Sequence, residues 1–145
     1  MKKLLTAFAI FSSATALAST PEQNKANALA FYDLAFNQHK VQEATDKYIG
    51  KGYLQHNPGV ADGGQAFVDA FAPFLKDHPK SKATIKRVMA DGDLVALHVH
   101  SQLNDEDRGE AVVDIFRFDK DGKIVEHWDV IQAVPENTES GRDMF

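Results

Sequence analysis

Two neighbouring stretches of sequence decide the fold of this chain: residues 94–100 (LVALHVH) and residues 111–116 (AVVDIF). Each has the pattern of a half-buried strand, in which successive side chains point to opposite faces. His98 and His100 therefore share one face of the first strand, and Asp114 shares a face of the second strand with its apolar neighbours two residues away. The pattern predicts that ionisable groups turn inward on two adjacent strands.

The register of this hairpin decides whether the three groups meet. If His98 or His100 pairs with Asp114, all three lie on one face, whereas a slip of one residue separates them. The connection over residues 104–109 is long enough to permit either arrangement. We expect the paired arrangement, in which two imidazoles face a carboxylate across the hairpin.

The second half of the chain predicts a meander of four strands. Its connections, at residues 91–92, 104–109 and 119–122, hold two to six residues. Connections this short imply antiparallel neighbours, because parallel neighbours need crossovers of a dozen or more residues. The predicted strands span residues 84–90, 94–103, 110–118 and 123–134.

Helices are predicted ahead of the meander. Thr20 followed by Pro21 marks a helix start, with Thr20 as the N-cap and Pro21 at the first helical position. Residues 53–58 (YLQHNP) have the pattern of a short strand or extended piece, halted by proline and glycine. Helices first and a curved meander afterwards predict a single α+β domain. The predicted helices span residues 20–38, 41–48 and 64–76.

The first 18 residues have the features of an export signal. Lys2 and Lys3 precede an apolar run over residues 4–11, and residues 16–18 (ALA) form a small-x-small cleavage site. Removing 18 of 145 residues leaves 127, which suits one compact domain with a single core. We therefore expect residues 19–145 to form one exported domain, located in the periplasm or secreted.

Composition narrows the classes of partner. Without its two signal lysines the chain keeps 14 of its 16 basic residues against 21 acidic ones, a formal net charge of −7. Nucleic acid is not expected as a partner, because phosphate binding needs a positive patch. No later stretch has the length of a bilayer-spanning helix, so no membrane association is expected once the signal is removed. The absence of cysteine excludes disulfides, thiolate catalysis and zinc–thiolate sites.

Three motifs carry a resemblance to a known family: residues 53–58 (YLQHNP), 91–95 (DGDLV) and 121–128 (DGKIVEHW). Together with the order of helices and strands, they resemble the SnoaL-like polyketide cyclase branch of the nuclear transport factor 2-like superfamily. The resemblance covers nearly all of residues 19–145. It implies a cone, in which a bent antiparallel sheet wraps around a long helix and an apolar pocket opens between sheet and helices.

The resemblance also implies a chemistry and an assembly. Cyclases of this type run intramolecular aldol condensations without a cofactor, using an inward carboxylate and a neighbouring histidine for proton transfer. Asp114 and His100 match that pair, with His98 beside them. The family further implies a homodimer formed through the outer face of the sheet.

Enolisation and aldol chemistry need a base beside a carbonyl carbon and a donor for the enolate oxygen. Asp114 would be the base, because apolar neighbours desolvate its carboxylate, and His100 its partner or the oxyanion donor. The ligand would be a small apolar or aromatic carbonyl compound. Glu126 and Asp129 are expected in solvent or at a subunit contact. The other expected pocket residues are Tyr53, His56, Phe116, His127 and Trp128.

Three alternatives remain at this point. Pairing Phe118 with Lys123 sets Asp114 opposite His127, whereas a bulge at Gly122, the arrangement we favour, sets it opposite Trp128. A metal-dependent enzyme is the second alternative, because a His-x-His strand with a further histidine or carboxylate suits zinc or non-haem iron. In that enzyme, the metal ligands would be His98, His100, Asp114 and His127. The third alternative is an exported protein that binds a small molecule without catalysis.

Overall fold

A computed structural model describes residues 18–145 of the chain. The predicted signal segment lies almost wholly outside the described residues. Within the described part, no helix is long and apolar enough to cross a membrane.

Three helical segments form the first layer, close to their predicted positions. Helix α1 (Pro21–Tyr32) begins as expected, with the Thr20 hydroxyl accepting a hydrogen bond from the Gln23 N–H at 3.2 Å. It continues into a π-helical turn, η1 (Asp33–Asn37), so the predicted helix ends near residue 38 but changes its winding. Helices α2 (Val41–Tyr48) and α3 (Gly64–Asp77) follow, and α3 contains Pro73.

The second layer is a five-stranded, curved sheet in the order β1-β5-β4-β3-β2. The predicted four-stranded antiparallel meander is confirmed. The fifth strand, β1, pairs parallel to β5 and makes the sheet mixed, whereas the sequence had indicated a short strand or extended piece at residues 53–58 without a partner. The strands span β1 (Ile49–Gln55), β2 (Lys82–Asp91), β3 (Leu94–Gln102), β4 (Glu110–Phe118) and β5 (Ile124–Ala133).

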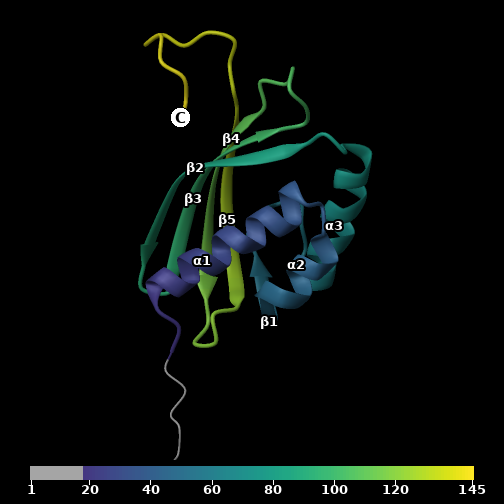
Figure 1. Cartoon of the computed structure of the whole chain (residues 1–145), viewed down its shortest axis with the longest axis vertical. Coiled ribbons are helices and arrows are strands. Elements are labelled where there is room, and N and C mark those ends of the chain that lie inside the picture. Colours follow the sequence, from purple (N-terminus) through teal and green to yellow (C-terminus); the bar gives the residue numbers. More distant parts are fainter. Residues whose placement is uncertain (1–17) are drawn as a thin grey trace, which may run out of the picture.

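The core lies between the inner face of this sheet and the helices. Figure 1 shows α1 running across the strands, with α2 and α3 gathered beside it toward the β1 edge. Phe31 of α1 lies edge-on to the Phe116 ring of β4, with ring centroids 5.8 Å apart. This arrangement is the predicted α+β fold, and it places the inward side chains of β1, β4 and β5 beneath the helices.

The β3–β4 register differs from the one we expected. Leu97 pairs with Asp114, so His98 pairs with Val113 and His100 with Ala111. Directly paired residues share a face, and both histidines therefore lie on the outer face, opposite to Asp114. The reason is the apolar content of β3: burying an aliphatic side chain stabilises the fold by about 1.5–3 kcal/mol, which favours turning the aliphatic set inward. The inward residues of β3 are Val95, Leu97 and Val99, each 0% exposed.

The β4–β5 register also differs from both arrangements that the sequence left open. Phe118 pairs with Ile124 beside an irregularity in the ladder, and Asp114 pairs with Asp129. His127, opposite Phe116, therefore faces the core, whereas Trp128 faces outward. The preference for Trp128 as the inward residue was wrong, because the irregularity lies at the Arg117–Phe118 step and not at the glycine of the turn.

Candidate functional site

The site is centred on Asp114, a carboxylate buried in the inner face of β4 with only 5% of its surface exposed. Its Oδ1 lies 2.9 Å from Nε2 of His127 on β5, and its Oδ2 accepts a hydrogen bond from the Tyr32 hydroxyl at 2.9 Å. Burying an unpaired carboxylate is costly, so these two partners explain how the fold tolerates it. The prediction that Asp114 faces inward is confirmed.

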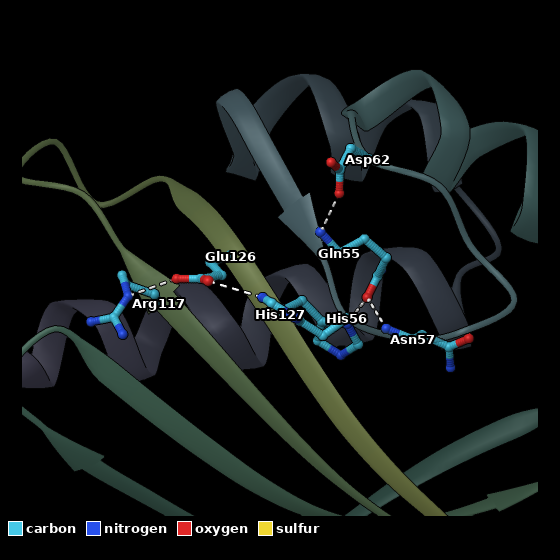
Figure 2. A network of polar contacts seen from close by, with 7 residues as sticks. All are labelled: Gln55, His56, Asn57, Asp62, Arg117, Glu126 and His127. Carbon is cyan, nitrogen blue, oxygen red and sulfur yellow. Dashed lines mark hydrogen bonds and ion pairs between the residues drawn. The ribbon is translucent and has the colours of Figure 1, made fainter.

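Gln55, at the end of β1, fixes the protonation of the other side of His127. Its Oε1 accepts a hydrogen bond from the Asn57 N–H at 2.9 Å, so this atom is the amide oxygen. The same oxygen lies 2.7 Å from Nδ1 of His127, which must therefore carry a proton. Figure 2 shows Gln55 reaching from β1 toward His127 on β5.

One proton is consequently shared between Asp114 and His127. With Nδ1 protonated, the 2.9 Å contact can be made in two ways: Nε2–H of an imidazolium donates to a carboxylate, or a neutral carboxyl donates to Nε2. In both states the pair has zero net charge and holds a transferable proton in a buried position. This arrangement suits general acid–base catalysis.

Two tyrosines complete the polar end of the site. Burial, followed by the charge of Asp114, raises the pKa of both the Tyr32 and the Tyr53 hydroxyl well above the ordinary value, so both phenols remain protonated. The Tyr53 oxygen accepts a hydrogen bond from Nε2 of Gln55 at 3.0 Å. Among residues 18–145 no acceptor takes the Tyr53 proton, which is therefore available to a ligand oxygen.

Asp129 is a member of the site that sequence reasoning missed. It lies directly across the ladder from Asp114, and its Oδ2 accepts a hydrogen bond from Nδ2 of Asn57 at 2.6 Å. The signal that could have found it is the strand period: two residues after His127, it must share the same face. We had expected Asp129 in solvent, because the register of β5 was unknown.

These groups line one end of a cavity of about 320 Å³ between the helices and the sheet. The rest of the lining includes phenylalanine rings of α1, η1 and α3, together with the exposed residues Lys82 and Glu110. The volume suits a small molecule, and apolar walls with a few convergent polar groups are typical of ligand sites. The lining includes Phe31, Tyr32, Phe36, Tyr53, Phe67, Phe71, Phe74, Asp114, Phe116, His127 and Asp129.

The structure does not bring His98 and His100 into this cavity, and the hypothesis that either assists Asp114 is corrected on geometric grounds. Nδ1 of His98 lies 3.0 Å from the Arg87 guanidinium, and Nε2 of His100 donates to the Arg108 carbonyl at 2.8 Å. Both rings also contact Phe145, with centroid distances of 5.4 and 4.4 Å. His127 occupies the position beside Asp114 that we had assigned to His100.

His56 and Trp128 also lie outside the cavity, on the outer face. Their rings stack at a centroid distance of 4.9 Å, and the Arg117 guanidinium lies 5.5 Å from the indole centroid. Nε2 of His56 lies 2.9 Å from Glu126, which also accepts a hydrogen bond from Arg117 (Figure 2). Hydrogen bonds from His56 and Arg117 hold the pKa of Glu126 below its ordinary value. Of the predicted pocket residues, Asp114, Tyr53, Phe116 and His127 line the cavity.

The predicted set of metal ligands is divided between two faces of the sheet, because His98 and His100 point away from Asp114 and His127. A different set does converge: Asp114, His127 and Asp129 offer ligand atoms within 4.8 Å of one another. Both ring nitrogens of His127 already bond to protein groups, so a metal bound by His127 would have to replace its contact with Asp114 or with Gln55.

Comparisons with known proteins agree with this architecture. The model of the SnoaL-like domain matches residues 28–127. A SnoaL-like protein of unknown function from Burkholderia thailandensis superposes with a TM-score of 0.67 at 16% identity, covering 80% of this chain and 99% of the other. No curated protein sequence matches this chain.

Two further solved structures have similar folds. AclR, a proposed hydroxylase from Streptomyces galilaeus, has a TM-score of 0.62 at 22% identity, covering 78% of this chain and 91% of its own. A proposed polyketide cyclase from Bacillus cereus has a TM-score of 0.64 at 22% identity, covering 76% and 74%. At these identities the likeness concerns the fold. From the domain match and the fold together, the chain belongs to the SnoaL-like family of the nuclear transport factor 2-like superfamily.

Proposed function

We propose that this protein is a cofactor-independent acid–base enzyme that acts on a small carbonyl compound, in the manner of a cyclase or isomerase. The observation that carries the proposal is the buried Asp114–His127 pair, which shares one proton at the end of an aromatic-lined cavity. Membership of the SnoaL-like family supports the same class of reaction. His127 takes the role that the sequence had suggested for His100.

The proposed chemistry begins with enolisation. The ionised Asp114 carboxylate removes a proton from the carbon beside the substrate carbonyl, and the Tyr53 O–H donates a hydrogen bond to the enolate oxygen that forms. In an isomerisation, Asp114 returns the proton to another carbon. In an aldol reaction, the enolate carbon attacks a second carbonyl and the alkoxide takes a proton from His127. Both routes balance without a cofactor.

Exchange of α-protons for deuterium tests this proposal without knowledge of the product. A panel of small cyclic and aromatic ketones is incubated with the protein in D2O, and the loss of the α-proton signal is followed by NMR. Asp114→Asn keeps the shape of the side chain and an acceptor for the Tyr32 hydroxyl but removes the base, so we expect exchange to fall by about 100-fold or more. Asp69→Asn is the matched control, because Asp69 is a hydrogen-bonded carboxylate on the exposed side of α3, outside the cavity.

The alternative is a binding protein without catalysis, which the aromatic cavity would also suit. The same experiment separates the two. No exchange with any ketone, combined with ligand affinity that changes in Asp114→Asn, would refute the enzyme and favour the carrier. Exchange that is equal in wild type and Asp114→Asn would remove Asp114 from the proposed mechanism.

We further propose that the protein is exported and forms a homodimer through the outer sheet face. Exposed apolar side chains on that face support the second part: Val113 and Val130 pair across β4 and β5, and Val130 is 71% exposed. Light scattering that gives the mass of one chain would refute the dimer. N-terminal sequencing of protein recovered from outside the cytoplasm tests cleavage after Ala18.

A further inference from the structure

The polar end of the cavity holds two carboxylates but only one group that can balance a negative charge. Asp114 has His127 as its partner, and this pair is neutral in either protonation state. Asp129 accepts from the amide of Asn57, which is uncharged. Among residues 18–145, no lysine or arginine forms an ion pair with Asp129. This part of the cavity lining therefore has a net negative charge centred on Asp129.

The exposed part of the cavity lining does not supply the missing cation. Lys82 is exposed there, but its ammonium is paired with Asp105, and Glu110 adds a further carboxylate to the lining. The charge of Asp129 also acts on the two tyrosines of the lining, because it adds to the effect of burial in raising the pKa of Tyr32 and Tyr53. An anionic ligand would face this negative charge without a partner.

The walls suit a positive charge as well. Phe36 lies edge-on to Phe67 and Phe71, with centroid distances of 6.1 and 5.4 Å, and Phe31 packs on Phe67 at 5.5 Å. Aromatic faces attract ammonium groups, especially where water is excluded. In addition, the buried Tyr53 hydroxyl has a proton free for a ligand oxygen, and Tyr53 is only 2% exposed.

We propose that the cavity selects a small organic cation: an amine whose ammonium group pairs with Asp129 and whose carbonyl oxygen accepts from Tyr53. This inference rests on the proposed function, since it defines the substrate class of the same site as amino ketones. Ligand atoms of Asp129 and Asp114 lie within 4.8 Å of one another. An ammonium on Asp129 therefore places the neighbouring carbon beside the Asp114 base.

Three matched probes test this selectivity by calorimetry at pH 7 and low salt: 2-phenylethylammonium, 3-phenylpropanoate and 2-phenylethanol. We expect the ammonium to bind at least about tenfold more tightly than the carboxylate. The ammonium forms a charge-assisted hydrogen bond with Asp129, whereas the carboxylate carries the same charge as Asp129 and is repelled. Asp129→Asn should reduce this ratio to about twofold or less. The control Asp69→Asn should keep it, because Asp69 lies on the exposed side of α3.

Retained binding of the neutral alcohol shows that Asp129→Asn is folded, and Asp129→Glu should restore the preference if the amide variant does not fold. Carboxylate binding equal to or tighter than ammonium binding would overturn the inference. So would the absence of binding by all three probes, or an equal loss of the ammonium preference in Asp69→Asn and Asp129→Asn. The two proposals fail separately. A preference for ammonium without α-proton exchange refutes only the catalysis, and exchange without the preference refutes only the substrate class.

Discussion

Gln55 and His127 come from strands that are far apart in the chain and adjacent in the sheet, and the 2.7 Å bond between them decides where the His127 proton resides. The amide oxygen of Gln55 holds a proton on Nδ1, which leaves Nε2 to share a proton with Asp114. Strand β1 thus acts on the site by setting the tautomer of His127.

Gln55→Leu is expected to reduce α-proton exchange by about 10- to 100-fold, because general acid–base catalysis is worth about 10²–10⁴ and a misoriented imidazole loses part of it. The ¹⁵N shifts of His127 should show protonation moving from Nδ1 toward Nε2. Gln55→Glu retains an acceptor and should keep the Nδ1 proton. Gln42→Leu is the matched control, since the Gln42 side chain donates to Asp46 on α2 and has no other hydrogen-bond partner within residues 18–145. Unchanged ¹⁵N shifts in Gln55→Leu would contradict this role.

The two outer histidines are expected to be dispensable for catalysis. His98→Asn and His100→Gln should leave exchange within about twofold of wild type, because both side chains lie on the face opposite to Asp114. His127→Gln should lower it by about 100-fold or more, because it removes the proton-sharing partner. Rates are measured on the same ketones. A loss in His100→Gln comparable to that in His127→Gln would disprove the observed register.

The Tyr32 hydroxyl is expected to stabilise the fold through Asp114. Tyr32→Phe should lower the free energy of unfolding by about 1.5–3 kcal/mol, because a buried carboxylate loses one of its two hydrogen bonds. Urea denaturation provides the measurement. The control is Tyr48→Phe, a tyrosine at the edge of burial whose hydroxyl forms no hydrogen bond among the described residues. An equal effect of both substitutions would show that the bond to Asp114 contributes little.

The outer network should make stability depend on pH through Glu126. Its pKa is lowered in the folded state by His56 and Arg117, so the folded protein binds fewer protons there than the unfolded chain. Its contribution is therefore present above the ordinary glutamate pKa of about 4.3 and is lost as the pH falls through the lower folded value. Wild type should exceed Glu126→Gln in stability at pH 6 and approach it near pH 3.

Denaturation curves across pH 3–7 measure this difference. Glu139→Gln, in the exposed C-terminal segment, is the control and should give a difference that does not vary with pH. If the difference in the free energy of unfolding between wild type and Glu126→Gln grew as the pH fell, the sign of the linkage would be contradicted.

Chelation should leave catalysis intact. After EDTA treatment and buffer exchange of untagged protein, the rate of α-proton exchange is expected to stay within about twofold, because both ring nitrogens of His127 are already bonded to Asp114 and Gln55. A loss that added Zn²⁺ or Fe²⁺ restores would instead favour a metal site at Asp114, His127 and Asp129. Metal analysis of the untreated protein accompanies the assay.

Local signals in the sequence predicted much of the scaffold. The Thr20 cap, the helix Val41–Tyr48 and the four-stranded meander follow from capping, periodicity and short turns, all of which act within a few residues. The inward position of Asp114 was also predictable, because alternation groups it with apolar neighbours on β4. The parallel pairing of β1 with β5, which contributes Gln55 and Asn57 to the site, has no local signal.

By itself, then, the sequence determined which side chains share a face of each strand, since that depends only on the two-residue period. Tertiary structure alone decided which faces point inward together and where the strands align. It turned Val95, Leu97 and Val99 of β3 toward the helices and the histidines outward, because total apolar burial is a property of the assembled core. The same packing set His127 beside Asp114.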